Sequence, residues 1–296
     1  MKKLICAIMT KFDRDGNLVL DDRYAEFLES LINSGVNTLM VAGTNGEFHA
    51  MKIEERKKLL EFVVEKFQGS VEIIAHVGTT NLKDTVDLGR HALDLGVRRL
   101  AVVAPYYFKY DESSIVNYFS RVAEHLREAE IILYNIPSFT GNRLNFSSIV
   151  EIAKRYGNVV GMKDSDTRPW IVSKIKKALG KDFLIFGGVD TLVVDYLSMG
   201  ADGQVSGTSN VFPKILRSIL DSFDSGNFEK AFDLQKILNE IVEKISGHEV
   251  FVNANKYALS VLGHDLGYSK APFRELEDDE KNSIESFLKD VKLWSI

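Results

Sequence analysis

The sequence predicts an α/β protein: a (βα)8 TIM barrel followed by a C-terminal helical extension. Two observations carry this prediction. Short apolar runs rich in Val, Ile and Leu recur about every 20–35 residues, and a longer amphipathic stretch follows each run. Runs that are apolar throughout suit parallel strands buried on both faces. Eight repeats of strand then helix therefore predict a parallel sheet with right-handed crossovers.

The apolar runs have the length of ordinary strands and are rich in β-branched residues. The predicted strands are Leu4–Met9, Thr38–Ala42, Val71–Val77, Leu100–Ala104, Ile131–Tyr134, Val159–Lys163, Phe183–Gly187 and Gly203–Ser206.

The stretches between the strands carry helix-end signals. Ile53–Phe67 opens with a Glu-rich first turn, and Asn81–Leu95 stops at Gly96, a residue typical of helix C-termini. The other predicted helices are Asp21–Ser34, Ser113–Leu126, Ser147–Arg155, Val172–Leu179, Thr191–Met199 and Pro213–Phe223.

A doubly wound open sheet is the alternative fold. No GxGxxG or GxxxxGK[ST] segment follows the first run, and the even spacing of eight strands favours closure into a barrel. No strand-like run follows Phe223, where three further helices are predicted. These are Asn227–Ser246, Val250–Leu262 and Asp278–Leu293. We therefore expect a catalytic barrel over residues 1–223 and a helical extension over residues 224–296 that packs on it.

Composition excludes several classes of protein. The net charge is −5 with both signs interleaved, so nucleic acid is not an expected partner. The single cysteine, Cys6, lies in an apolar run and is interpreted as a buried hydrophobe. No segment is apolar over the ~20 residues of a membrane span, and no signal peptide is recognised, which predicts a cytoplasmic protein. The six histidines show no HxxxH spacing, so no metal is expected.

Catalytic residues of such barrels lie where the strands end. Lys163 ends the sixth run and Tyr134 the fifth. Consecutive strands are neighbours, so the two side chains are expected to face each other. An amine held in a barrel mouth loses hydration, which favours the neutral form that attacks a carbonyl, and a phenol beside it can relay protons. The alternatives are a surface lysine and a tyrosine that only packs.

The turn after the second run offers anion donors. Gly43 and Gly46 permit a tight turn with backbone N–H groups facing inward, while Thr44 and Asn45 add side-chain donors. Such a turn can hold a small carboxylate, and Glu47 is expected to brace it by accepting from backbone N–H groups. The alternative is an ordinary βα turn.

These segments together resemble the family of dihydrodipicolinate synthase, N-acetylneuraminate lyase and the 2-keto-3-deoxygluconate aldolases, over essentially the whole chain. The motifs that carry the resemblance are GTNGE at Gly43–Glu47, APYYF at Ala104–Phe108, YNIP at Tyr134–Pro137, GMKDS at Gly161–Ser165, GGVD at Gly187–Asp190 and GADGQVSG at Gly200–Gly207.

The resemblance implies roles for these positions. Lys163 is the implied Schiff-base lysine and Tyr134 the proton relay. Thr44 and Asn45 are implied to bind the carboxylate of pyruvate. The family usually has two hydroxyl residues there, so Asn45 removes the second hydroxyl of the relay and leaves Thr44 as the catalytic hydroxyl.

Further positions are implied at the edge of the pocket and between subunits. Gly188 and Val205 match positions whose carbonyl oxygens line the pyruvate pocket. Tyr107 matches a catalytic tyrosine that reaches into a neighbouring subunit, or it only packs a dimer interface. Members of the family are usually homotetramers built as dimers of dimers.

One position separates the possible reactions. Synthases of dihydrodipicolinate place an arginine where this chain has Phe139, and a phenyl ring cannot grip a carboxylate. Arg143, four residues on, is a candidate substitute. Ser165 and Asp190 match positions that bind sugar hydroxyls in the aldolases, although Ser165 could instead cap a helix and Asp190 serve as an N-cap.

The resulting hypothesis is a Schiff-base aldolase, or lyase, that converts a 2-keto-3-deoxy sugar acid into pyruvate and an aldehyde. Its only cofactor would be the covalent lysine imine. The first alternative is dihydrodipicolinate synthase, which condenses pyruvate with aspartate semialdehyde, and a dehydratase of similar acids comes third. A non-catalytic 2-oxo-acid-binding protein is the alternative from another class.

Overall fold

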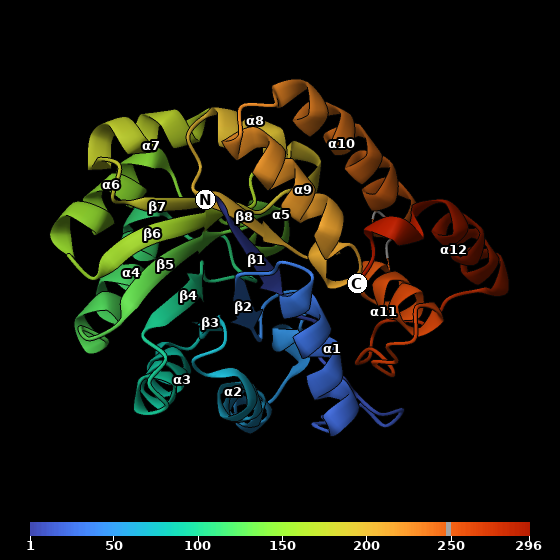
Figure 1. The fold of residues 1–296 in the computed structure, drawn as a ribbon. Coiled ribbons are helices and arrows are strands. Elements are labelled where there is room, and N and C mark those ends of the chain that lie inside the picture. Colours follow the sequence, from blue (N-terminus) through green and yellow to red (C-terminus); the bar gives the residue numbers. More distant parts are fainter. Residues whose placement is uncertain (247–249) are drawn as a thin grey trace. The chain divides into compact units, whose positions relative to one another are not determined.

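The computed structural model describes residues 1–246 and 250–296. Eight parallel strands pair in chain order and close into a barrel, with helices between consecutive strands, which confirms the predicted TIM barrel. Figure 1 follows this alternation from the N-terminal strand to the C-terminal helices. The strands are β1 Lys3–Ala7, β2 Thr38–Val41, β3 Glu72–His76, β4 Arg99–Val103, β5 Glu130–Asn135, β6 Val159–Asp164, β7 Leu184–Gly187 and β8 Gly203–Ser206.

The helices follow the amphipathic stretches, and most of their ends agree with the prediction to within about two residues. The exception is the predicted helix Asn227–Ser246: its α-helical part ends at Ile241, and Val242–Ser246 form a π-helical turn. They are α1 Asp22–Asn33, α2 Ile53–Phe67, α3 Leu82–Asp94, α4 Glu112–His125, α5 Pro137–Thr140, α6 Phe146–Arg155, α7 Ile171–Leu179, α8 Val193–Ser198 and α9 Pro213–Asp224, then α10 Phe228–Ile241, α11 Phe251–Val261 and α12 Asp278–Val291 of the C-terminal extension. α5 was not predicted, because four residues are too few to show a helical period.

Local chemistry explains several helix ends. The Asp21 carboxylate accepts from the backbone N–H of Tyr24 at the start of α1, and the Asn81 side chain caps α3 in the same way. Gly35 and Gly96 follow α1 and α3 with positive φ angles, the left-handed conformation that glycine adopts without strain.

The chain divides into two compact units, and each is described by itself. The first unit comprises Met1–Glu72 and Ser206–Ile296, and the second comprises Ile73–Val205. The domain boundary at residue 223 stays a prediction. The first unit holds β1 and β2, whose buried residues include Cys6, in agreement with its interpretation as a core residue.

The second unit holds β3 to β7, which pair in parallel with one register shift, between Ile131 and Ile132 of β5 where it pairs with β6. Gly161 of β6 has no side chain, which lets β6 lie close to β7. A Cβ at this position would lie 2.4 Å from the carbonyl oxygen of Leu184 in β7. No larger residue fits there without a shift of the backbone.

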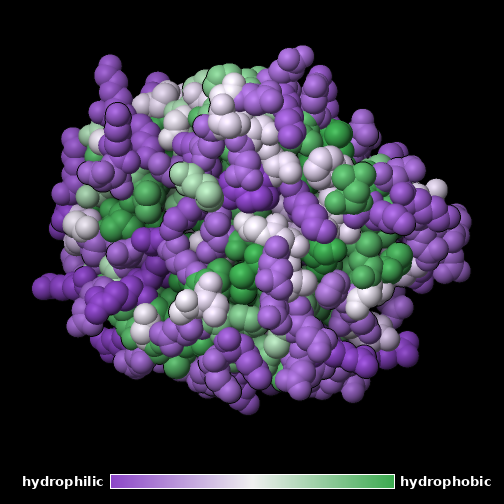
Figure 2. All heavy atoms as spheres, in the orientation of Figure 1, coloured by the Kyte–Doolittle hydropathy of each residue, from purple (hydrophilic) through white to green (hydrophobic). Residues whose placement is uncertain are grey.

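The face drawn in Figure 2 is mostly hydrophilic, with hydrophobic groups scattered over it. Among the described residues, no helix has both the length and the apolar character that crossing a membrane requires.

Candidate active site

Lys163 and Tyr134 are neighbours across the β5–β6 ladder, paired directly in register. Both are buried, Lys163 to 4% exposure. The lysine Nζ lies 4.1 Å from the centroid of the tyrosine ring. The predicted proximity is therefore confirmed, and the lysine does not extend into solvent. The arrangement places an amine and a phenol side by side at the end of the strands.

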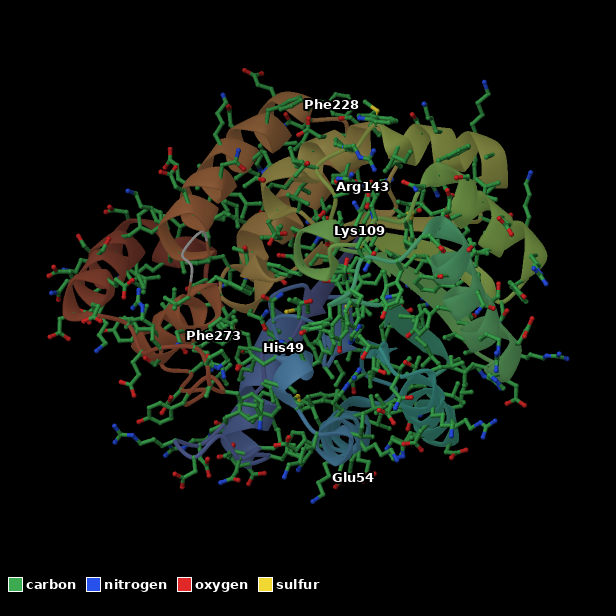
Figure 3. The ribbon with its side chains drawn as sticks, turned by 180° about the vertical axis from the view of Figure 1, so that it is seen from behind. His49, Glu54, Lys109, Arg143, Phe228 and Phe273 are labelled. Carbon is green, nitrogen blue, oxygen red and sulfur yellow. The ribbon has the colours of Figure 1, made fainter. Side chains whose placement is uncertain are left out.

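His76 packs against the same tyrosine. It is buried at the end of β3, and its ring lies edge-on to Tyr134 with 5.8 Å between centroids. His49, in the first unit, lies edge-on to Phe48 and to Phe273, which Figure 3 labels beside it. Both histidines thus contact aromatic rings, His76 in the interior and His49 at the surface.

Gly188 and Ser165 lie against the lysine. A Cβ on Gly188 would be 2.1 Å from Ser165 Oγ and 3.0 Å from Lys163 Cε. Only glycine leaves room for both side chains. Ser165 Oγ is itself buried and has no hydrogen-bond partner among residues 1–246 and 250–296. A buried hydroxyl without a partner is costly, which marks this atom as a candidate to bind a substrate group.

Two capping alternatives are wrong. Ser165 does not cap a helix, because α7 begins at Ile171 with Trp170 as its N-cap. Asp190 is the first residue of a short 3-10 turn whose N-cap is Val189. The Asp190 carboxylate instead accepts from Gln204 Nε2 at 2.9 Å. The hydroxyl-binding roles of Ser165 and Asp190 stay predictions, as does the role of Val205, which is buried in β8.

A polar network surrounds Asp164, the residue after the lysine. Its Oδ1 accepts from Asn135 Nδ2 at 2.7 Å, and its Oδ2 lies 3.0 Å from the hydroxyl of Tyr196, which also hydrogen-bonds the carbonyl oxygen of Asp166. Burial raises the pKa of the Asp164 carboxyl to about 6, although the two hydrogen bonds oppose the rise.

The hydrogen bonds around Asp164 were not predicted from the sequence. Asp164 and Asn135 directly follow the two catalytic candidates, and that adjacency is the only signal for them. Tyr196 comes from α8, whose contact with β6 follows only from the folded chain.

Arg143 is held by a buried carboxylate. Its Nε and Nη2 lie 2.8 and 3.2 Å from the two oxygens of Asp166, and Arg168 binds the same residue at 2.8 Å. Burial raises the pKa of Asp166, but the bonds from the two guanidinium groups outweigh this effect and lower it overall. The guanidinium of Arg143 is thus engaged within the protein. Phe139, by contrast, is 61% exposed on α5.

The turn after β2 lies in the first unit. Its positive φ angles fall on Ala42 (54°) and Glu47 (60°) and not on the glycines. Gly46 packs closely instead: a Cβ there would lie 3.0 Å from the carbonyl oxygen of Ile8 and from Thr10 Oγ1, a tight contact. The two glycines of this turn thus have no positive φ angle, and the contribution of Gly46 is close packing.

The hydrogen bonds of this turn are largely internal. The N–H groups of Gly46 and Glu47 donate to the carbonyls of Gly43 and Thr44, so these two do not face inward as predicted. The Asn45 side chain packs on Gly207, whose Cβ would lie 2.4 Å from Asn45 Nδ2. Glu47 accepts from a backbone N–H group as predicted, that of Lys270, while its role in bracing the turn stays a prediction.

Tyr107 lies on an exposed loop after β4. Its φ angle is 82°, unusual for a tyrosine, and its side chain is 88% exposed. Asn142 shapes this loop: its amide donates to the carbonyls of Pro105 and Phe108 and accepts from the N–H of Tyr110. A side chain so exposed is compatible with both predicted roles of Tyr107, reaching into a neighbouring subunit or packing in a dimer interface. Both roles stay predictions.

Metal ligands are not gathered in the described part of the chain, where no group of three His, Cys, Asp or Glu side chains is close enough to hold an ion. The expectation of metal-free chemistry stays a prediction.

Comparisons with known proteins agree with this geometry. A model of the dihydrodipicolinate synthetase family matches residues 1–291. The 4-hydroxy-tetrahydrodipicolinate synthase of Thermoanaerobacter sp. (strain X514) is 31% identical over 286 residues, which cover 95% of this chain and 94% of that protein. The N-acetylneuraminate lyase of Lactiplantibacillus plantarum is 29% identical over 271 residues, 92% of this chain and 91% of the other.

Solved structures give the same result. YagE, a prophage protein of E. coli K12 in complex with pyruvate, superposes with a TM-score of 0.92 at 27% identity and 99% coverage of both chains. Dihydrodipicolinate synthase from Aquifex aeolicus superposes with the same score and identity, over 100% of this chain and 99% of the other. The chain belongs to the dihydrodipicolinate synthetase family and is a lyase of the aldolase type.

Proposed function

We propose that this protein cleaves a 2-keto-3-deoxy sugar acid to pyruvate and an aldehyde through an imine on Lys163. The single observation that carries the proposal is the buried Lys163–Tyr134 pair, with Nζ 4.1 Å from the ring centroid. A buried amine beside a phenol provides both the nucleophile and the proton carrier that imine chemistry needs.

The reaction begins when the Lys163 amine attacks the C2 carbonyl of the acid. Tyr134 delivers a proton to the departing oxygen, water leaves, and a protonated imine remains. Tyr134 then takes the proton of the C4 hydroxyl, the C3–C4 bond breaks, and its electron pair moves into the enamine while the aldehyde departs. Protonation at C3 and hydrolysis by water release pyruvate and restore the amine.

The carboxylate of the 2-oxo acid is assigned to Thr44 and Asn45, whose hydroxyl and amide are suitable donors. Gly188 and Val205 line the pocket through their carbonyl oxygens. No cofactor beyond the covalent imine takes part.

Two observations support a hydroxylated substrate. Ser165 Oγ is buried beside Lys163 Cε without a partner among the described residues, so a substrate hydroxyl there would satisfy it. Arg143 is already bound through two nitrogen atoms to Asp166, and the position of the synthase arginine holds Phe139. A second substrate with its own carboxylate, such as aspartate semialdehyde, therefore lacks its expected partner.

Dihydrodipicolinate synthase activity is the second candidate. The observation in its favour is the 31% identity to a synthase, against 29% to a lyase. A Phe139→Arg variant distinguishes the two, because a gain in use of aspartate semialdehyde would show that this position decides specificity. Absence of any gain would count against our interpretation of Phe139.

The decisive experiment is borohydride trapping. The protein is treated with pyruvate and sodium borohydride, digested, and analysed by mass spectrometry. We expect a reduced pyruvate adduct on Lys163, and none on a Lys163→Arg variant. Cleavage of 2-keto-3-deoxygluconate is then measured beside condensation of pyruvate with aspartate semialdehyde. A protein that binds pyruvate without an adduct would instead be a non-catalytic 2-oxo-acid-binding protein.

For the assembly we propose a homotetramer built as a dimer of dimers, with Tyr107 at a subunit interface, and for the location the cytoplasm. Sedimentation of the purified protein tests the first, and cell fractionation the second. The exposed Tyr107 and Phe108 rings, 5.0 Å apart between centroids, provide an aromatic surface of the kind that interfaces favour.

A further inference from the structure

The turn that carries Thr44 and Asn45 is held at both ends by unusual backbone angles. Ala42 precedes it with φ 54° and Glu47 ends it with φ 60°. Side-chain-bearing residues adopt this left-handed conformation only where the surroundings enforce it. The shape of the turn therefore depends on contacts from elsewhere in the chain.

Those contacts come from the C-terminal extension through the carboxylate of Glu47. This carboxylate is fully buried. Its Oε1 accepts from Lys256 Nζ at 2.9 Å, and its Oε2 accepts from the backbone N–H of Lys270 at 2.7 Å. Both oxygens are thus bound by residues more than 200 positions away in the sequence.

Lys256 is as buried as its partner. It projects from α11, and its ammonium also donates to the carbonyl oxygen of Tyr268 at 2.6 Å and lies 4.8 Å from the centroid of the Phe12 ring. Burial lowers the pKa of Lys256, while the Glu47 charge opposes that change. A buried ion pair contributes little to net stability compared with apolar packing, but it favours one geometry, because displacing either group would leave a buried charge without its counter-charge.

We propose that Lys256 is a positioning residue: through its ion pair with Glu47 it holds the Thr44–Asn45 turn in the form that binds the carboxylate of the 2-oxo acid. The C-terminal extension thereby sets the affinity for this acid without touching it. The inference rests on the proposed function, in which Thr44 and Asn45 bind that carboxylate.

A Lys256→Met variant tests the proposal, since methionine keeps an unbranched chain and removes the charge. We expect the KM for the 2-oxo acid to rise about tenfold or more while kcat at saturation changes less than about threefold, the pattern of a lost binding contact. A general structural defect would instead lower the fraction of active protein, and with it kcat, at unchanged KM.

The matched control is Lys176→Met. Lys176 also bonds one carboxylate, Asp202 at 2.6 Å, and backbone carbonyls, including that of Phe183 at 2.8 Å, but Lys176 and these partners belong to the second unit, whereas the turn belongs to the first. We expect its KM to stay at the wild-type value. An equal rise of KM in both variants would overturn the proposal.

Loss of Lys256 alone leaves the Glu47 charge buried, so the single variant is prone to unfold. A Glu47→Gln, Lys256→Met double variant removes both charges and keeps an acceptor for the Lys270 N–H. We expect it to fold, by circular dichroism, and to retain the raised KM. A folded double variant with wild-type KM would refute the positioning role.

Borohydride trapping separates this proposal from the proposed function. With saturating pyruvate, the Lys256→Met or double variant should still form the adduct on Lys163. An adduct in the wild type together with an unchanged KM in the variants overturns only the role of Lys256. Absence of the adduct in the wild type overturns the proposed function itself.

Discussion

The buried carboxyl of Asp164, at the end of β6, makes the free energy of unfolding depend on pH. Its carboxyl has a pKa of about 6, raised from 3.8 by burial. The folded state therefore holds the proton more tightly than the unfolded chain. This group stabilises the fold below about pH 4, and its contribution to the free energy of unfolding falls by roughly 3 kcal/mol as the pH rises through 6.

An Asp164→Asn variant has no carboxyl to titrate, so its free energy of unfolding should not fall in this way as the pH rises. We expect the difference in free energy of unfolding between variant and wild type to shift in favour of the variant as the pH rises from 4 to 7. Urea unfolding followed at several pH values measures it. Parallel pH profiles for the two proteins would show that Asp164 does not titrate in this range.

Tyr134 offers a second prediction at the residue scale. A Tyr134→Phe variant keeps the ring that packs against Lys163 and His76 but loses the hydroxyl. We expect kcat to fall by about 100-fold or more, the usual contribution of a general acid and base, with little change in the melting temperature. Steady-state kinetics and thermal unfolding provide the test, and a variant with near-wild-type kcat would remove the tyrosine from the mechanism.

At the scale of elements, the approach of β6 to β7 depends on the missing side chain of Gly161. A Cβ there would meet the Leu184 carbonyl oxygen at 2.4 Å, and backbone atoms cannot rotate away. We expect Gly161→Ala to lower the free energy of unfolding by about 1–3 kcal/mol, as overpacked cores do. Because Lys163 lies two residues further along β6, kcat should fall as well.

Gly157, just before the same strand, is the control. A Cβ at this glycine would meet nothing within 4 Å. Gly157→Ala should therefore change the free energy of unfolding by no more than about 0.5 kcal/mol. Chemical denaturation of both variants makes the comparison, and equal stabilities would mean that the strands can move apart without cost.

At the scale of the whole molecule, the C-terminal extension contributes buried residues to the core. α10 packs on α9, and its residues Ala231, Leu234, Leu238 and Ile241 are buried. The extension also supplies both partners of the Glu47 carboxylate. The first compact unit accordingly combines the two ends of the chain.

We therefore expect a chain that ends at Phe223 to lose cooperative folding, because truncation exposes the α9 surface and leaves the Glu47 charge buried without a partner. Thermal unfolding and binding of a hydrophobic dye measure this. A soluble fragment with a sharp unfolding transition would instead support an independent barrel domain over residues 1–223.

The sequence by itself determined the fold and the reacting pair. Short runs that are apolar throughout are typical of strands buried on both faces, and their even alternation with eight amphipathic helices favours a barrel over an open sheet. Consecutive strands of a barrel are neighbours, so Tyr134 and Lys163, each at the end of its run, were expected to lie together, and the structure pairs them in register.

Only the tertiary structure decided which polar groups share a buried space. Tyr196 meets Asp164 across 32 residues and Lys256 meets Glu47 across 209, and hydrophobic periodicity says nothing about such pairs. It also decided that Arg143 binds Asp166, and that Gly46 packs closely against Ile8 and Thr10. Local patterns record whether a residue is buried, whereas the identity of its partner depends on how distant segments pack.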